Sequence, residues 1–199
     1  MPDKYKNKYR IPSARLQSWD YSSNGSYFIT ICTQDRIHYF GEIEGEEMFL
    51  NEDGLLAEQC WLQIPTKFPF IELGNFIVMP NHVHGILIID NNVATRFPVE
   101  TRLIASPPPP PTETRLIASL PRGGFAGDKN PMLNDNISRV VRWFKGRCSF
   151  DIRKTCTDFE WQTRFHDHII RDAESFETIQ DYIANNPRNW KQDKFCNPL

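Results

Sequence analysis

The sequence predicts a single domain of the α+β class, in which short strands joined by tight turns are combined with amphipathic helices. A length of 199 residues suits one ordinary domain, and 40% apolar residues are enough to bury a core. Runs of β-branched and aromatic residues indicate strands, and apolar residues at helical spacing indicate helices.

Strands are expected where such runs follow turn signals. The Asn24-Gly25 pair precedes the first run, SYFITICT. A Pro80-Asn81 turn separates two later runs, because proline pre-sets the first turn position and asparagine tolerates the second. The predicted strands span residues 26–33, 75–79 and 82–89, with a hairpin over 41–51 that turns near Gly45.

Helices are expected at 52–64, ended by Pro65, and at 137–154. A last helix begins after Asp172 as N-cap and runs to about Asn186, because the residue before Pro187 is disfavoured in a helix. Residues 159–165 form an extended aromatic segment. The second helix has one apolar stripe, formed by Ile137, Val140, Val141, Phe144 and Cys148.

Residues 90–131 differ from the rest of the chain. The heptapeptide ETRLIAS occurs at 100–106 and again at 113–119, and the prolines 107–111 lie between the copies. A proline run favours an extended, unpaired backbone, so we expect a disordered insertion within the single domain of residues 1–199.

The net charge of −2 argues against a nucleic-acid partner, but the charges are unevenly distributed. Residues 37–66 hold seven acids and no Lys or Arg, whereas 1–15 and 137–154 are basic. A basic face can therefore lie beside an acidic one, and the local field is what attracts phosphate. The five cysteines form no C-x-x-C pair, and no apolar run is long enough for a membrane helix, so a cytoplasmic protein with reduced thiols is expected.

Two H-x-H pairs are candidate metal sites. His82 and His84 are two apart on a predicted strand, so both imidazoles project from one face. Two imidazoles on a rigid strand at a sheet end suit a divalent metal. His166 and His168 lie in a less strand-like context and are interpreted as structural or DNA-contacting.

The last helix offers a second constellation. Tyr182 and Asn186 are four apart and share one helix face, while Phe176, Ile179 and Ile183 form its buried stripe. A tyrosine supplies a hydroxyl nucleophile, and an amide oxygen suits a hard cation such as Mg²⁺ or Mn²⁺. Core packing of Tyr182 and C-capping by Asn186 are the alternatives.

Four blocks of this sequence are together similar to one enzyme group. They are residues 8–33, 79–88 (MPNHVHGILI), 160–179 and 181–190 (DYIANNPRNW). The sequence resembles the IS200-type single-tyrosine transposases, also called HUH transposases, and is most similar to the REP-associated tyrosine transposases. The resemblance covers nearly the whole chain outside the 90–131 insertion.

The resemblance implies a ferredoxin-like antiparallel sheet with helices packed on one face, plus a C-terminal helix that bears the tyrosine. It implies that His82 and His84 bind a divalent metal, Mg²⁺ or Mn²⁺, with Asn186 as third ligand. It implies that Tyr182 attacks single-stranded DNA near hairpins, giving a covalent 5′-phosphotyrosine and a free 3′-hydroxyl. Relatives use the tyrosine within one subunit or across a homodimer.

Basic and aromatic residues are expected to bind the DNA. Two alternatives remain open: a DNA- or RNA-binding module without catalysis, and a metal hydrolase without a covalent step. The hydrolase is disfavoured because no carboxylate lies near His82 and His84 on their strand. The expected DNA-binding residues are Lys6, Arg10, Arg139, Arg142, Lys145, Trp161, Arg164 and His168.

Overall fold

The computed structural model describes residues 19–91 and 135–196. Its centre is an antiparallel sheet with the strand order β4-β5-β1-β6, and a separate hairpin, β2-β3, lies beside it. The strands are β1 (Gly25–Cys32), β2 (Gly41–Glu44), β3 (Glu47–Leu50), β4 (Ile71–Met79), β5 (His82–Ile89) and β6 (His166–Ile170). The helices are α1 (Glu52–Leu62), α2 (Ile64–Lys67), α4 (Ile137–Ile152) and α5 (Ala173–Ala184), with 3₁₀ turns η2 (Gln34–Arg36) and η4 (Trp190–Gln192).

The connectivity confirms the α+β class. Apart from the β2-β3 hairpin and α2, the chain runs β1-α1-β4-β5-α4-β6, and the first strand lies between the third and fourth strands of the sheet. This is the ferredoxin-like arrangement of two interlocked strand-helix-strand units. It makes β5 and β1 the central strands, so residues on β5 have neighbours on both sides.

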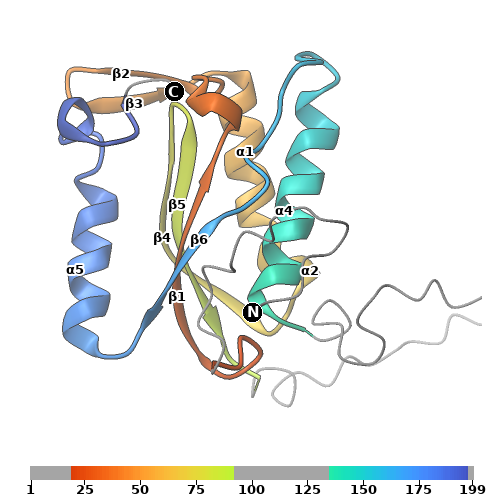
Figure 1. The fold of residues 1–199 in the computed structure, drawn as a ribbon, viewed down its shortest axis with the longest axis vertical. Coiled ribbons are helices and arrows are strands. Elements are labelled where there is room, and N and C mark those ends of the chain that lie inside the picture. The colour runs from red at the N-terminus through yellow and green to blue at the C-terminus, as the bar shows by residue number, and fades with distance from the viewer. Residues whose placement is uncertain (1–18, 92–134, 197–199) are drawn as a thin grey trace, which may run out of the picture.

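The sheet is covered on both faces (Figure 1). Helices α1 and α4 lie on one face and α5 on the other. Between the sheet and α1 and α4, Tyr27, Trp61 and Phe144 are fully buried. All five residues of the predicted α4 stripe are buried there too, so its helical spacing was interpreted correctly.

The opposite face holds a smaller apolar cluster. Ile183 of α5 packs with Ile86 and Ile170, and Phe176 and Ile179 pack partly against them. The Asp172 side chain accepts a hydrogen bond from the Ser175 amide, which confirms the predicted N-cap. Tyr182 therefore stands on a helix whose angle to the sheet is set by a short apolar stripe.

Some predicted boundaries were wrong. Pro65 does not follow a continuous helix: α1 ends at Leu62 and α2 begins at Ile64, with the proline in its first turn, where no helical N–H bond is lost. Strand β4 begins at Ile71 rather than Asn75, with an irregularity between Leu73 and Phe76.

Some expectations remain outside the described residues. They concern Lys6, Arg10 and nearly all of the 90–131 insertion. No helix in the described ranges combines the length and apolar character needed to cross a membrane. All five cysteines are unpaired, as expected.

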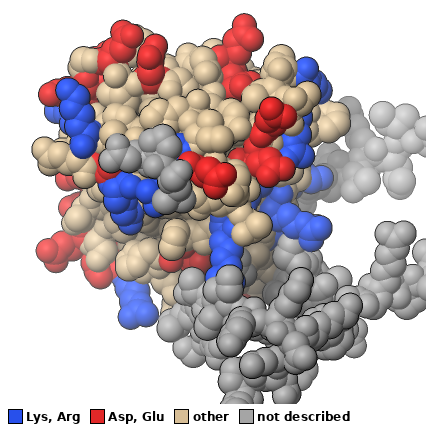
Figure 2. Space-filling view, turned by 45° about the horizontal axis from the view of Figure 1, so that its top comes forward, with Lys and Arg blue, Asp and Glu red and all other residues tan. Residues whose placement is uncertain are grey.

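The charge asymmetry is present in the fold. Glu42, Glu44, Glu46 and Glu47 are exposed on the β2-β3 hairpin, and Arg139, Arg142 and Arg147 are exposed on α4. Figure 2 shows acidic and basic residues mixed on one face, with acidic residues prevailing along its upper edge.

Gly85 is a packing constraint next to the histidines. A Cβ atom there would lie 2.3 Å from a carbon of the Trp61 ring and 2.9 Å from the Phe76 Cβ. We expect Gly85→Ala to lower the free energy of unfolding by about 1–3 kcal/mol, measured by urea denaturation.

Gly146 on α4 is the matched control, since a Cβ atom there meets nothing within 4 Å. Gly146→Ala should leave stability unchanged or raise it by up to about 1 kcal/mol, because alanine is the better helix former. Equal stability of the two variants would contradict the close approach of Trp61.

Candidate functional site

The two histidines of β5 lie side by side on the face covered by α5. Their ring centroids are 4.4 Å apart, and the side chains of His82 and His84 are 0% and 1% exposed. Val83 between them points into the core under α1 and α4. The strand period therefore places the imidazoles together as predicted, at the end of the sheet next to the Pro80-Asn81 turn.

Asn81 determines the tautomer of His82. Its side-chain NH₂ donates to the carbonyl oxygens of Arg36 (3.0 Å) and Phe195 (2.8 Å), which fixes the orientation of the amide. The Asn81 Oδ1 lies 2.8 Å from His82 Nδ1, so this ring nitrogen carries the proton and donates it. The lone pair of His82 then resides on Nε2, which is buried and has no partner among the described residues.

His84 is held in a similar way. Its Nδ1 lies 2.9 Å from the Thr30 hydroxyl on β1, and its Nε2 lies 3.3 Å from the Tyr182 hydroxyl. A phenol that donates to Nε2 leaves the ring proton on Nδ1, directed at Thr30. Both imidazoles thus present an Nε2 lone pair on the same side.

Tyr182 reaches this pair from α5. Its hydroxyl also lies 3.5 Å from Asp193 Oδ2, and the side chain is 39% exposed. Burial and then the negative charge of Asp193 raise the pKa of Tyr182, and the nearby Asn186 amide opposes the shift without forming a hydrogen bond to it. The phenol is therefore protonated at neutral pH, and it is accessible from solvent on one side.

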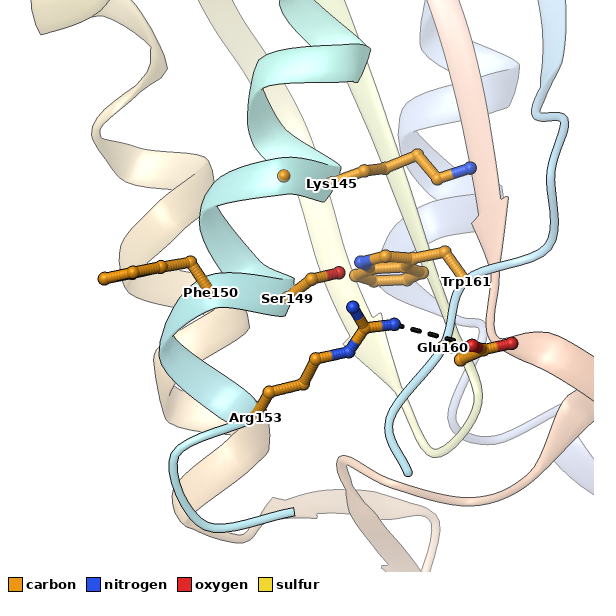
Figure 3. A pocket seen from close by; sticks show the side chains of 7 residues that line it. Lys145, Ser149, Phe150, Arg153, Glu160 and Trp161 are labelled. Carbon is orange, nitrogen blue, oxygen red and sulfur yellow. Dashed lines mark ion pairs between the residues drawn. The ribbon is translucent and has the colours of Figure 1, made fainter. Parts of the chain in front are cut away.

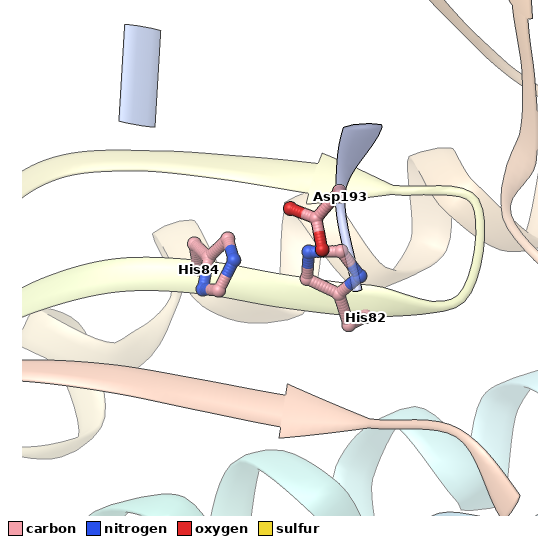
Figure 4. A group of neighbouring side chains, drawn as sticks. All are labelled: His82, His84 and Asp193. Atoms are coloured by element: carbon pink, nitrogen blue, oxygen red, sulfur yellow. The ribbon is translucent and has the colours of Figure 1, made fainter. Parts of the chain in front are cut away.

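Asp193 is the site residue that sequence reasoning missed. One of its carboxylate oxygens and one nitrogen of each of His82 and His84 lie within 4.8 Å of one another. Asp193 comes from the C-terminal segment after η4, and Figure 4 shows it reaching toward His82. It belongs to no motif, so its spacing in the sequence carries no signal.

The C-terminal segment also covers the histidines. The Phe195 ring centroid is 4.8 Å from that of His82, and the Trp190 ring lies 6.0 Å away. Arg36 donates to the Lys194 carbonyl at 2.7 Å, which ties the segment to the turn after β1. This cover explains why both imidazoles are fully buried although they stand at the end of a strand.

Asn186, the predicted third ligand, lies two residues beyond α5 and is 1% exposed. Neither atom of its side-chain amide has a hydrogen-bond partner among the described residues. An unpaired buried amide is costly, so it calls for a ligand.

These groups fit a divalent metal ion. Two neutral imidazoles and one carboxylate converge, and the buried, unpaired Asn186 amide lies near Tyr182, whose hydroxyl contacts His84. Nitrogen and oxygen donors of this kind suit Mn²⁺, Mg²⁺ or Zn²⁺. The two imidazoles are also held in position for this role, because Asn81 and Thr30 form hydrogen bonds with their Nδ1 atoms.

Most of the expected DNA-binding residues lie away from Tyr182 and the two histidines of β5. Arg139 and Arg142 are exposed on α4, which lies on the other side of the sheet from Tyr182. Lys145 Nζ is directed at the carbonyl oxygens of Gln162 and Arg164. The ammonium group of Lys145 is thus engaged within the protein.

Trp161 is part of the core. It is 8% exposed and packs against Phe40, Phe144 and Phe159, so little of its ring is accessible for the expected base stacking. It lines a hollow of about 690 Å³ beside α4, together with Lys145, Ser149, Phe150, Arg153 and Glu160 (Figure 3). The sequence pattern of an aromatic near basic residues did not distinguish a core ring from a surface ring.

His166 and His168 lie on the edge strand β6, and both are exposed. Arg164, two residues before His166, is exposed as well. The second H-x-H pair is therefore on a strand, contrary to the expectation of a less regular context. It is not part of the His82, His84 and Asp193 group.

The burial of the histidine pair has a consequence for stability. Burial and then the charge of His84 lower the pKa of His82 well below 6.5, and burial and the charge of Lys194 lower the pKa of His84 to about 3. The unfolded chain therefore binds more protons than the native protein below pH 6.5, so stability falls as the pH decreases.

We expect the free energy of unfolding, measured in a chelator, to fall between pH 6 and pH 5 with a slope approaching about 1.4 kcal/mol per pH unit for each histidine. His84→Gln should remove about half of this slope, and the exposed His168→Gln should not change it. A slope that is the same in all three proteins would contradict the neutral buried pair.

Comparison with known proteins supports the fold and the kinship of this chain. No family model matches the sequence. The solved structure of a REP-associated tyrosine transposase bound to a REP hairpin superposes on this chain with a TM-score of 0.52, covering 92% of this chain and 77% of that chain. The sequence identity is 17%, so this similarity shows a shared fold. An uncharacterised protein of Haemophilus influenzae is 36% identical over 183 residues, or 92% of this chain and 91% of that protein. The chain therefore belongs to the same protein family as this Haemophilus influenzae protein.

Proposed function

We propose that this protein is a metal-dependent enzyme that cuts and rejoins single-stranded DNA through a covalent bond to Tyr182. The observation that carries the proposal is the 3.3 Å contact between the Tyr182 hydroxyl and His84 Nε2, which joins a helix and a strand far apart in the sequence. A tyrosine used only for core packing has no reason to direct its hydroxyl at a histidine pair while 39% exposed.

The chemistry of the chain follows from these contacts. Tyr182 Oη attacks the phosphorus, the bond from phosphorus to the 3′ oxygen breaks, and a 5′-phosphotyrosine and a 3′-hydroxyl result. The phenol must lose its proton as it attacks, because its pKa is raised above 10. In the metal-free protein the hydroxyl donates to His84 Nε2 at 3.3 Å; with that lone pair bound to the metal, Asp193 Oδ2 at 3.5 Å would be the acceptor for the proton. The tyrosyl phosphate keeps the bond energy, so a 3′-hydroxyl can reverse the step without ATP.

We assign the metal ligands to His82, His84 and Asp193, with the Asn186 amide oxygen as the fourth. A divalent cation held there would polarise the scissile phosphate and stabilise its developing charge. Asn81 and Thr30 orient the imidazoles. The donor set favours Mn²⁺ or Mg²⁺, since it includes two oxygens, although Zn²⁺ binds such ligands too.

The proposed partner is single-stranded or hairpin DNA. The structurally similar transposase is described as bound to a REP hairpin, which supports this choice of partner. Arg139 and Arg142, with Lys6, Arg10 and Arg164, are proposed to contact phosphates. The unpaired thiols suit a reducing compartment, so we propose a cytoplasmic enzyme.

One observation favours a second candidate function. Asp193 provides the carboxylate ligand that a metal hydrolase typically has and that the β5 strand itself lacks. In that case an activated water, rather than Tyr182, would attack the phosphate.

Tyr182→Phe separates the two candidates. With labelled single-stranded hairpin DNA and Mn²⁺, we expect the parent to give a covalent adduct on a denaturing gel, and both Tyr182→Phe and EDTA to abolish it. Tyr39→Phe is the matched control, because this hydroxyl donates to the Asp158 carbonyl away from the site. Cleavage that persists in Tyr182→Phe would establish the hydrolase instead.

Metal binding can be tested without any activity. A hundredfold excess of Mn²⁺ over its Kd should raise the melting temperature by roughly 5–10 °C. Asp193→Ala and Asn186→Ala should each diminish this rise, and Asp158→Ala, at an exposed loop position, should not.

Asn186→Ala has a second expected outcome. The side-chain amide of Asn186 makes no hydrogen bond, so its removal should not lower the free energy of unfolding of the metal-free protein. A full Mn²⁺-induced rise in Asn186→Ala would exclude this residue as a ligand.

A further inference from the structure

Helix α5 covers only part of its face of the sheet. Helix α5 packs chiefly against β4, and its apolar cluster reaches β6 at Ile170, the last residue of that strand. Earlier in β6, His166 and His168 are exposed. The first residues of β6 therefore face solvent on this side of the sheet, whereas Thr30 of β1 beside them is buried.

The strand register places all four histidines of the two H-x-H pairs on this face. Thr30 of β1 pairs with His84 on one side and with His166 on the other. Paired residues in adjacent strands direct their side chains to the same face. The His84, Thr30 and His166 side chains thus form a row across the sheet, with the two imidazoles about 10 Å apart by the spacing of two strands.

A second row on the same face lies two residues further along each strand. Phe28 pairs with Ile86 and with His168. The Phe28 ring stacks on His84 with centroids 5.1 Å apart and meets Tyr182 edge-on at 6.0 Å. Phe28 is therefore a half-buried aromatic residue that lies between the Tyr182 side chain and His168 on this face of the sheet.

The β6 edge is also hollowed. A cavity of about 400 Å³ lies there, lined by His168 and Arg171 with Tyr21, Ser175, Asp167 and Asp172. It combines an aromatic ring with hydrogen-bond donors and with two carboxylates. The carboxylates repel a phosphate but accept hydrogen bonds from amino groups, so this hollow suits a nucleobase.

His166 and His168 have no structural role that would account for them. Their side chains are exposed and make no hydrogen bond or ion pair within the described residues. They also take no part in the His82, His84 and Asp193 group. Imidazoles can donate to phosphate oxygens and stack on bases.

We propose that edge strand β6 is the binding site for the single strand next to the cleaved bond. His166 contacts the phosphate adjacent to the scissile one, and His168 holds a neighbouring base in the hollow at the β6 edge. The inference rests on the proposed function, because it takes Tyr182 as the point of attack. It assigns substrate-binding roles to the second H-x-H pair.

Equilibrium binding tests this site apart from catalysis. In a Tyr182→Phe background with EDTA at fixed low salt, fluorescence anisotropy would compare a labelled single strand with an abasic strand of equal length. His166→Ala should weaken binding of both strands about tenfold. His168→Ala should weaken binding of the normal strand about tenfold and leave that of the abasic strand unchanged, because only a base occupies the hollow.

Two further variants serve as controls. Asp158→Asn, at an exposed loop position outside β6 and its hollow, should cause no loss of affinity. His166→Gln should recover part of the loss seen with His166→Ala, since it retains a donor. In the Tyr182 protein with Mn²⁺, the alanine variants should raise the DNA concentration for half-maximal adduct formation without lowering the rate at saturation.

Affinities within twofold of the parent in both alanine variants would overturn the inference. A loss confined to Arg139→Ala/Arg142→Ala would instead place the strand over α4. Failure of the proposed function is a different result: the parent then binds DNA but forms no adduct at Tyr182, whatever the effect of the β6 variants.

Discussion

The site depends on one buried residue, Asn81, whose side chain and backbone carbonyl together are hydrogen-bonded to four other residues. Its amide joins the η2 turn, through the Arg36 carbonyl, to the C-terminal segment, through the Phe195 carbonyl, and it orients His82. Its backbone carbonyl accepts hydrogen bonds from both the amide and the hydroxyl of Thr33 at the end of β1. A turn residue thus fixes the imidazole, the segment that carries Asp193 and the end of the central strand relative to one another.

One face of the sheet forms the main apolar core, and the other face holds the polar groups of the candidate site. Residues of β5 alternate, so Val83, Gly85 and Leu87 face α1 and α4 while His82, His84 and Ile86 face α5. The first set is apolar and closely packed, and the absence of a side chain at Gly85 leaves room for Trp61. Because the core on one face is complete, the other face can hold polar groups that lack partners, such as His82 Nε2 and the Asn186 amide.

Features that depend on interactions between residues close in the sequence could be predicted, and features that depend on contacts between distant segments could not. The placement of His82 and His84 on a strand, of Tyr182 on a helix and of the apolar stripe on α4 was predicted correctly, because strand and helix periods are local. Asp193 was missed because it comes from a segment whose position depends on contacts with Asn81 and Arg36. Trp161 was expected to stack on bases, but its ring is largely covered, which composition does not show. Asn81 was recognised as a turn former, yet its role in fixing a tautomer is visible only in three dimensions.

The place where the duplicated repeat joins the fold has an evolutionary consequence. Strand β5 begins with His82 and ends at Ile89, about 23 Å away at 3.3 Å per residue. Asn91 and Ile137, near the two ends of the intervening chain, are both hydrogen-bonded to the loop before β1, at Ser22, Asn24 and Tyr21. Chain that leaves and re-enters at one loop can change in length at a cost of only about 0.6 kcal/mol per doubling. Tandem duplication of ETRLIAS at this position is therefore a nearly neutral genetic event, because it lengthens the chain at the end of the sheet remote from the histidines.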